Sequence, residues 1–486
     1  MLDISKLNIK HLSRLIASRE ISCHEIADAT IEKIEKLNPR LNAFITILDQ
    51  SARNQAKYAD YLIEQGKYLG PLHGIPISLK DLIYIKGVRS TSGSKILADF
   101  VPDYDSTVTR KLRDAGAVII GTNNMHEFAS GITGINPHYG ASKNPWDISR
   151  MSGGSSGGSA VSVSSAMSFG SIGTDTSGSI RVPSSLCGIF GLKPSYGRVS
   201  KHGVMPLAPS IDHVGPLARS AWDIAAILGV IAGYDKHDTS SAKVPVQDYL
   251  KEISLASEKG NTNSKNSSDH SGEFKIGIPK QFFFDMIEPK VMDTFRNFVD
   301  RLQGCGIATA SDVDVDRLDK ILETWRTIRL SESAAVHSDW IVSRAQDYGD
   351  DVRKMLEIGL EITAAKYINS IHKWRQQIKA EFLKAMSKYD ALLVPSTIIP
   401  APFLDEKEVN IEGKTIEVYF SLSRLTYVFD VIGFPALNIP AGLVDSKLPV
   451  GVQLVGRPFD EAQILKIAYR YEQHYNLTEK FSPPIT

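Results

Sequence analysis

The sequence contains few cysteines and has no excess of charge of either sign. Its 486 residues include only three cysteines, Cys23, Cys187 and Cys305, which lie far apart and form no CxxC pair. This spacing excludes a disulfide framework and a thiolate zinc site, and it suits a reducing compartment. The 55 Lys and Arg residues balance the 55 Asp and Glu residues. No basic surface for binding nucleic acid or an anionic membrane is therefore predicted.

Long hydrophobic segments are also missing. The longest strongly apolar stretch covers residues 224–232, far fewer than the roughly 20 residues needed to cross a bilayer. The N-terminal sequence MLDISKLNIK lacks the apolar core of a secretion signal. With 42% hydrophobic and 23% charged residues, the composition is that of an ordinary globular protein. We expect a cytoplasmic enzyme.

Short apolar runs between glycine-containing turns predict an α/β fold. Six runs are expected to be buried strands, at residues 75–79, 117–120, 168–173, 275–279, 391–394 and 436–440. Helical patterns such as residues 106–115 and 160–167 lie between them. This alternation is typical of helices covering a largely parallel sheet. We expect a central mixed, mostly parallel β-sheet with helices on both faces.

The regions around these strands carry separate signals. Ser22 followed by Glu25 forms a capping box that predicts the start of a helix, and Pro39 is expected to stop it. Helices are also predicted over residues 289–302 and across most of residues 318–388. Residues 257–272 contain no apolar side chain, so we expect a flexible surface loop inserted within one domain.

Two windows rich in glycine and serine carry the strongest chemical signal. Residues 152–159 read SGGSSGGS, and residues 173–179 read GTDTSGS. Glycine lets the backbone approach a ligand closely, and serine hydroxyls can relay protons or attack a carbonyl. Successive peptide N–H groups in such a turn can form an anion-binding nest or an oxyanion hole.

Three chemistries compete for these windows. Phosphate binding is disfavoured because Gly178 is followed by Ser179, where a P-loop has lysine. An α/β-hydrolase elbow remains open because residues 153–157 satisfy GxSxG, with His202 or His213 available downstream. A run of glycine and serine satisfies that pattern almost automatically, however. The third chemistry is a serine nucleophile activated by a lysine.

Lys80 is the candidate base for this third chemistry. Its context, HGIPISLKDLI, places an amine at the end of an apolar candidate strand. Loss of hydration there would lower the pKa of the amine and let it act as a neutral base. The competing interpretation is a lysine that reaches solvent or pairs with Asp81. The local sequence leaves both interpretations open.

Other features have structural interpretations that we prefer. His126 and Glu127 resemble half of a zinc motif, but HEFAS lacks the second histidine of HExxH, so hydrogen bonding or packing is expected. Asp175 and Arg181 lie on either side of Ser179 and are expected to scaffold its turn as a pair. Cys187 lies in the apolar sequence SLCGIF and is expected in the core.

Taken together, the motifs resemble the amidase signature family. They are GIPISLKD around Lys80, GGSSGGSA at residues 153–160, and GTDTSGSIRVPSSLCGIFGLKPSYGRVS at residues 173–200. The resemblance is strongest over residues 69–235, returns at GFPALNIPAG (residues 433–442) and VGVQLVGRPFDE (residues 450–461), and is weakest over residues 236–388. It implies one domain over residues 1–486. Its parts would be N-terminal helices (1–68), a catalytic core (69–235), a helical substrate-side region (285–390) and the C-terminal part of the core (391–486).

The resemblance also implies a Ser, cis-Ser, Lys triad. Ser179 matches the acyl-accepting nucleophile, Ser155 matches the bridging serine after a cis peptide bond, and Lys80 matches the base. The backbone N–H groups of Thr176, Ser177, Gly178 and Ser179 match the oxyanion hole, although the family more often has glycine at position 177. No metal or organic cofactor is implied.

Two functions follow from the resemblance. The one that we prefer from the sequence is a free-standing amidase that hydrolyses small-molecule carboxamides through an acyl-enzyme, with a homodimer as one expected assembly. The alternative is the glutaminase A subunit of the tRNA-dependent Asp/Glu amidotransferase, working with B and C subunits. For that alternative, the A subunit has an acidic residue that holds the glutamine amine, and here that position is Ser423. It also has an arginine-bearing KRR segment that receives the glutamine carboxylate; this segment corresponds roughly to Arg353, Lys354 and Met355 and is only partly kept. Neither function predicts direct contact with nucleic acid or a membrane.

Overall fold

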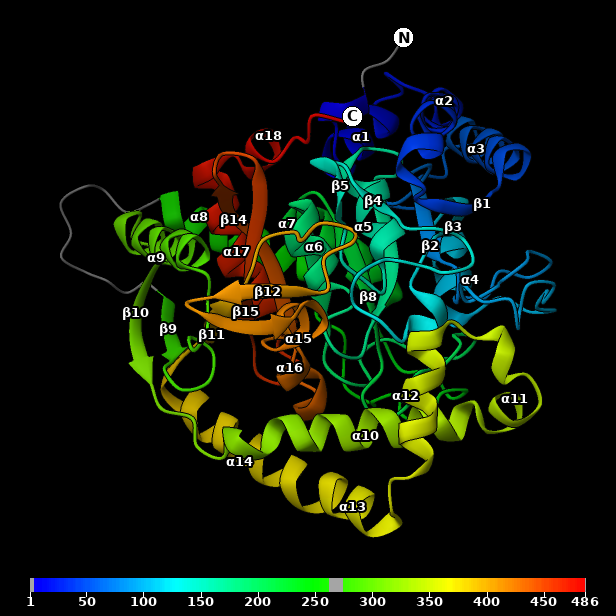
Figure 1. Ribbon diagram of the computed structural model, residues 1–486. Coiled ribbons are helices and arrows are strands. Elements are labelled where there is room, and N and C mark those ends of the chain that lie inside the picture. The colour runs from blue at the N-terminus through cyan, green and yellow to red at the C-terminus, as the bar shows by residue number, and fades with distance from the viewer. Residues whose placement is uncertain (1–3, 262–273, 486) are drawn as a thin grey trace.

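A computed structural model describes residues 4–261 and 274–485, which form a large sheet enclosed by helices (Figure 1). The sheet has 11 strands in the order β1-β3-β2-β6-β8-β7-β14-β15-β11-β9-β10. These strands are β1 (Phe44–Ile47), β2 (Pro76–Lys80), β3 (Val118–Asn123), β6 (Gly170–Asp175), β7 (Phe190–Lys193), β8 (His213–Ala218), β9 (Phe274–Pro279), β10 (Ala308–Val313), β11 (Ala391–Pro395), β14 (Ala436–Val444) and β15 (Leu448–Val455). All six strands predicted from the sequence are present.

The sheet is mixed, as expected. Strands β3, β2 and β6 are parallel to one another, and so are β11, β9 and β10. Between these two blocks, β8, β7, β14 and β15 are joined by antiparallel pairings, and β1 runs antiparallel to β3 at one edge. Two small antiparallel pairs lie outside it: β4 (Lys143–Asn144) with β5 (Asp147–Met151), and β12 (Glu408–Ile411) with β13 (Lys414–Glu417).

Helices cover both faces of the sheet, which confirms the α/β class. Alternate residues of β11 show this directly, because Leu393 packs into one hydrophobic core while Leu392 and Val394 pack into the other. The first core includes residues of α7 (Ala221–Ile231) and α17 (Glu461–Tyr475). The second includes residues of α6 (Arg181–Cys187), α10 (Ile321–Val336), α14 (Arg375–Ala385) and α16 (Tyr427–Ile432).

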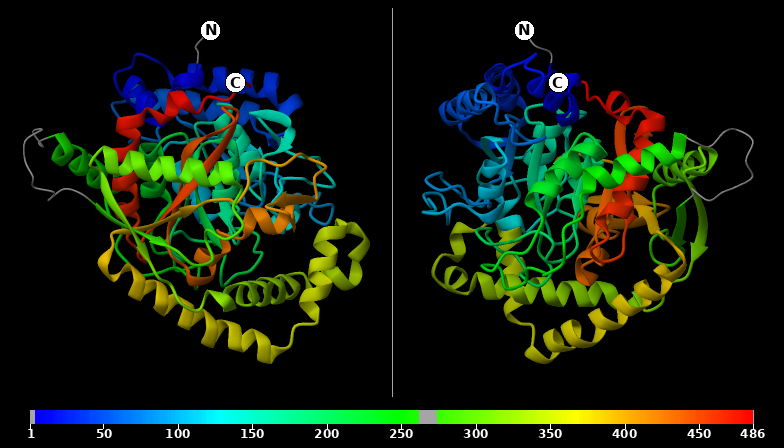
Figure 2. Two further views of the ribbon diagram at one scale, coloured as in Figure 1. Left: turned by 60° about the vertical axis from the view of Figure 1, so that its left-hand side comes forward. Right: turned by 180° about the vertical axis from the view of Figure 1, so that it is seen from behind.

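The remaining helices complete the shell. They are α1 (Ile9–Ala17), α2 (Cys23–Leu41), α3 (Asp49–Glu64), α4 (Thr107–Asp114), α5 (Gly157–Ser164), α8 (Tyr249–Asn261), α9 (Pro289–Gly304), α11 (Ser338–Ser343), α12 (Asp350–Leu360), α13 (Ala364–Asn369), α15 (Val418–Ser423) and α18 (Leu477–Lys480). Figures 1 and 2 show α10, α13 and α14 as a layer along one side of the molecule. Among the described residues, no helix is long and apolar enough to cross a membrane.

Two local predictions need correction. The capping box is present, with Ser22 and Glu25 bonded reciprocally, but α2 continues past Pro39 to Leu41. The helix ends instead where Asn42 adopts a left-handed conformation (φ 52°) and its N–H donates to Asn38 O. The predicted loop over residues 257–272 is wrong at its start, because residues 257–261 belong to α8; its remaining residues lie outside the described part of the chain.

Candidate active site

Lys80 lies at the carboxyl end of β2, inside the sheet, and its side chain is fully buried. Its Nζ lies 2.6 Å from Ser155 Oγ and 2.8 Å from Thr174 Oγ1. Burial lowers the pKa of Lys80 to about 7, and the Asp175 and Asp212 carboxylates act in the opposite direction. The amine neither reaches solvent nor pairs with Asp81, so the competing interpretation of Lys80 is excluded.

Ser155 lies in the loop before α5, and the peptide bond between Gly154 and Ser155 is cis, as the resemblance implies. Gly154 fits this loop because a Cβ there would lie 2.7 Å from Gly134 N. The Ser155 carbonyl accepts the N–H of His126 at 3.1 Å, and the next residue, Ser156, donates its N–H to Ser179 O at 3.2 Å. The two glycine-serine windows are therefore bonded to each other.

Ser179 lies in the turn between β6 and α6. Asp175 holds this turn, since its Oδ1 accepts Gly178 N–H at 2.5 Å and its Oδ2 accepts Ile180 N–H at 3.1 Å. Gly178 has a φ of +115°, and a Cβ there would collide with Thr426 Oγ1 at 2.1 Å. Both the backbone conformation and the space therefore require glycine at this position.

The triad residues are brought together only in part. Lys80 is bonded to Ser155, but among the described residues no hydrogen bond joins the Ser155 hydroxyl to Ser179. The four predicted oxyanion donors fall into two groups, one already bonded and three without a partner within the described residues. Gly178 N–H is already bonded to Asp175, which corrects the prediction for that residue. The N–H groups of Thr176, Ser177 and Ser179 have no partner in the part of the chain that the structure describes.

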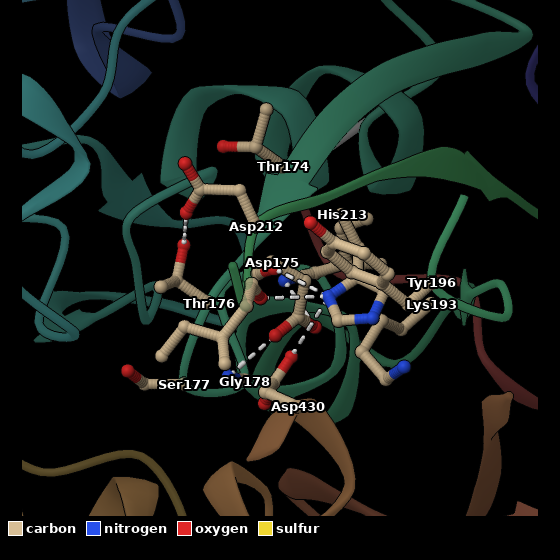
Figure 3. A network of polar contacts seen from close by, with 12 residues as sticks. Thr174, Asp175, Thr176, Ser177, Gly178, Lys193, Tyr196, Asp212, His213 and Asp430 are labelled. Carbon is tan, nitrogen blue, oxygen red and sulfur yellow. Dashed lines mark hydrogen bonds and ion pairs between the residues drawn. The ribbon is translucent and has the colours of Figure 1, made fainter. Parts of the chain in front are cut away.

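A fully buried ion network contacts the nucleophile turn, and Figure 3 shows two of its carboxylates, Asp175 and Asp430. Arg181 donates to Asp175 through Nε (3.0 Å) and to Asp430 through an Nη (2.6 Å), which confirms the predicted Asp175–Arg181 pair. Its other Nη donates to Gln453 Oε1 at 2.7 Å and to Thr426 O at 3.0 Å. Burial by itself would raise the pKa of Asp175, but the Arg181 charge holds it well below its usual range. Asp175 is therefore ionised when it bonds the turn.

Two further buried bases extend this network. Burial lowers the pKa of Lys193 to about 7, and the pKa of His213 is lowered well below its usual value for the same reason. His213 Nδ1 donates to Ile211 O at 2.8 Å. His213 therefore stays neutral and bonded to the backbone, and it is Lys80 that contacts the GxSxG serine Ser155. The hydrolase interpretation is not supported.

The Ser177 side chain binds the substrate-side helices. Its hydroxyl accepts the indole N–H of Trp325, on α10, at 2.9 Å. The Trp325 ring stacks on Tyr427 with ring centroids 4.5 Å apart and an angle of 13° between the planes. The serine that replaces the usual glycine therefore gives α10 a direct bond to the nucleophile turn.

A cavity of about 770 Å³ lies beside this turn. Thr174 and Thr176 connect it to the triad, while α10 contributes Glu332, Ala335 and Val336. Most of its remaining wall comes from residues 196–240, between β7 and the segment after α7. This size and mixed lining are typical of a small-molecule site.

The remaining sequence candidates have structural roles. His126 Nε2 lies 2.9 Å from Asp351 Oδ2, and Glu127 Oε1 lies 2.9 Å from His138 Nε2. The His126 imidazole and the Glu127 carboxylate are thus each used in a hydrogen bond, as expected. Cys187 is fully buried, and burial raises the pKa of its thiol.

Comparison with known proteins identifies the family. The family model described as Amidase matches residues 25–465. The chain belongs to the amidase family. Relatives include the A subunits of glutamyl-tRNA(Gln) amidotransferase from Marinomonas sp. (36% identical; 96% of this chain and 96% of that protein) and Carboxydothermus hydrogenoformans (35%; 97% and 98%).

Solved structures agree. A peptide amidase bound to the competitive inhibitor chymostatin has a TM-score of 0.84 and 29% identity, covering 99% of this chain and 100% of that chain. The A subunit of glutamyl-tRNA(Gln) amidotransferase from Thermotoga maritima has a TM-score of 0.78 and 30% identity, covering 98% and 96%. This amidase is therefore an amide-hydrolysing enzyme, and the relatives favour the amidotransferase alternative over the free-standing amidase.

Proposed function

We propose that this amidase cleaves a carboxamide through an acyl-enzyme on Ser179, with Ser155 and Lys80 as its proton relay. The observation that carries this proposal is the buried Lys80 amine, with a pKa of about 7, at 2.6 Å from Ser155 Oγ. A neutral amine can accept the Ser155 proton while it donates to Thr174. A base with a pKa near the working pH is the most effective for this step.

The chemistry proceeds in two stages. Lys80 takes the Ser155 proton as Ser155 takes the Ser179 proton, and Ser179 Oγ attacks the amide carbonyl. The relay returns the proton to the leaving nitrogen as the C–N bond breaks, and water then cleaves the acyl ester. The Ser155 and Ser179 hydroxyls need to approach each other only when substrate is bound, since catalytic hydrogen bonds often tighten at that point.

The oxyanion would be bound by the free N–H groups of Thr176, Ser177 and Ser179. Gly178 instead gives its N–H to Asp175 and shapes the turn. Removing one donor of such a hole typically costs about 10²- to 10³-fold in rate.

Glutamine is the first candidate substrate. The relatives at 35–36% identity over nearly the whole chain support a role as the glutaminase component of a tRNA-dependent amidotransferase, releasing ammonia from glutamine in the cytoplasm with B and C subunits. In this role the chain itself needs no contact with nucleic acid.

A free-standing amidase is the second candidate, and the structure of the two glutamine-binding positions favours it. Ser423 is buried and donates its hydroxyl to Tyr419 O at 3.0 Å, so it offers no carboxylate to a substrate ammonium group. In the segment of residues 353–355, Met355 has its sulfur 3.3 Å from an Nη of Arg329, and the Arg353 guanidinium is paired with Asp350 and Glu357. The large cavity would admit amides bigger than glutamine.

Ammonia release distinguishes the two candidates. The purified chain is assayed with glutamine, asparagine, benzamide and an aliphatic amide, alone and with the B and C subunits of the same organism, and Ser179→Ala is the control. Turnover confined to glutamine and raised by the partners supports the amidotransferase. Turnover of simple amides by the chain alone supports the free-standing amidase, and wild-type turnover equal to that of Ser179→Ala contradicts both.

A further inference from the structure

Asp212 connects the cavity to the nucleophile turn. Its Oδ1 accepts the Thr176 hydroxyl at 2.7 Å, and its Oδ2 accepts the N–H groups of Leu207 and Ala208 at 2.9 and 3.0 Å. The antiparallel register explains this contact, because β6 pairs Asp175 with His213 and so brings the next residues outward, Thr176 and Asp212, opposite each other. One carboxylate therefore fixes both a proposed oxyanion residue and the loop that forms the cavity wall.

Asp212 is also close enough to act on the base. Thr174, which accepts a hydrogen bond from Lys80, lines the same cavity as Thr176 and Asp212. Figure 3 shows the side chains of these three residues. Thr174 and Thr176 are two residues apart along an extended chain, so their side chains lie on the same side. The 770 Å³ cavity therefore lies on the side of β6 where Thr174 contacts Lys80, and Asp212 lines the same cavity.

Two carboxylates oppose the effect of burial on Lys80, first Asp175 and then Asp212. Asp175 lies on β6 and Asp212 before β8, while Asn123, opposite Lys80 on β3, is neutral. Asp175 is neutralised by its buried pair with Arg181. Within the described residues Asp212 forms no such ion pair, and its carboxylate is held by the Thr176 hydroxyl and by the N–H groups of Leu207 and Ala208.

We propose that Asp212 is a positioning residue of the amidase reaction, which stabilises the protonated Lys80 formed during attack and holds Thr176 N–H in place. This inference rests on the proposed function of Lys80 as the base. The proton that Lys80 takes from Ser155 creates a buried ammonium, and a nearby fixed carboxylate lowers the energy of that charge without any rearrangement. A neutral side chain at position 212 leaves a weaker base that loses its proton at lower pH.

The test uses the rate at which a fluorophosphonate labels Ser179, because this rate needs no knowledge of the substrate. In labelling, a bond forms between Ser179 Oγ and phosphorus, fluoride leaves, and the serine proton passes through Ser155 to Lys80. The rate is measured from about pH 5 to about pH 9, on either side of the usual range for a general base. In the wild type it should rise with pH through the pKa of Lys80.

Asp212→Asn is the decisive variant. Its amide oxygen can accept from the Leu207 and Ala208 N–H groups while its NH₂ donates to the Thr176 hydroxyl, so the hydrogen bonds are kept and only the charge is lost. The midpoint of its pH profile should move to lower pH and its plateau rate should fall. A slower plateau with an unchanged midpoint would overturn the inference, since a purely structural role would act in that way.

Two matched variants separate the shift of the pH midpoint from the fall of the plateau rate. Asp238 is a second carboxylate that lines the cavity and accepts backbone N–H groups, from Lys201 and Ser240. Asp238→Asn should leave the midpoint unchanged, and an equal shift would overturn the assignment to Asp212. Thr176→Val keeps the charge but removes the bond to Asp212, so it should lower the plateau alone; an unchanged plateau would overturn the positioning role.

Folding and the proposed function are checked separately. If Asp212→Asn does not fold, Asp212→Ser is the second neutral variant and should show the same shift to lower pH. Wild-type protein that is not labelled at Ser179 would refute the triad. Labelled wild type with an unmoved midpoint in the neutral variants would refute only the role of Asp212.

Discussion

Replacing Lys80 by methionine should remove a pH dependence of stability that this buried amine causes. Burial lowers the pKa of Lys80 from 10.5 to about 7. Between these pH values the unfolded chain binds more protons at this residue than the folded chain does, so the free energy of unfolding rises with pH. The rise amounts to about 1.4 kcal/mol per pH unit and roughly 5 kcal/mol over the whole window. Below about pH 7 both states are protonated and the slope disappears.

Urea denaturation of wild type and Lys80→Met at about pH 7, 8 and 9 measures this effect. Methionine is similar in length and carries no charge, so the wild-type free energy of unfolding should increase relative to the variant as pH rises. The fluorophosphonate labelling rate should fall by at least about 10²-fold in the variant, because its general base is gone. If the free energies of unfolding of wild type and variant changed equally with pH, Lys80 would not be a neutral buried lysine. Undiminished labelling of the variant would contradict the role of Lys80 as base.

Lys193→Met is the matched control. Lys193 is equally buried, burial also lowers its pKa to about 7, and its Nζ donates to Pro194 O at 3.1 Å, away from Ser155. This variant should show the same change in pH-dependent stability while Ser179 is still labelled. Loss of labelling in both variants would mean that Lys80→Met acts through general destabilisation.

Three further substitutions test the surroundings of the site by urea denaturation. Arg181→Met leaves Asp175 and Asp430 buried without their cation and should cost about 3–5 kcal/mol; a loss below about 1 kcal/mol would contradict the buried network. Ser177→Ala removes the acceptor of the Trp325 indole N–H and should cost about 1–3 kcal/mol, unlike the near-neutral outcome expected if that bond were absent. Ser22→Ala removes the capping box of α2 and should cost about 0.5–2 kcal/mol, with unchanged labelling of Ser179.

The sequence predicted six of the strands from short apolar runs between glycine-containing turns. Strands β2, β3, β6, β9, β11 and β14 fall within or overlap the predicted runs. Strand β10 was missed because half of the residues in its sequence, ATASDV, are polar, and because it lies at the sheet edge, where most of its residues are not buried. Strand β8, HVGPLA, contains glycine and proline, which more often mark turns. Neither strand has a local signal strong enough to outweigh its composition.

The candidate site and its Asp175–Arg181 pair were predicted through motifs, whereas the supporting residues that are distant in the sequence were not. Lys80 and Ser155 lie in recognisable windows, and the structure bonds them. Thr426, Asp430 and Gln453 contact Arg181 or its turn from segments roughly 250 residues away. Such pairings depend on the tertiary fold and leave no spacing pattern in the sequence. The bond from Gly178 N–H to Asp175 is local, since it joins residues three apart, but it depends on the conformation of the turn and was not predicted either.

The most direct test of the account is intact-protein mass spectrometry after fluorophosphonate treatment of wild type, Ser179→Ala and Lys80→Ala, with peptide mapping of the adduct. We predict one adduct on the wild type, located at Ser179, and none on either variant after the same exposure. An unlabelled but folded wild type, or an adduct that persists in Ser179→Ala, would contradict the proposed nucleophile.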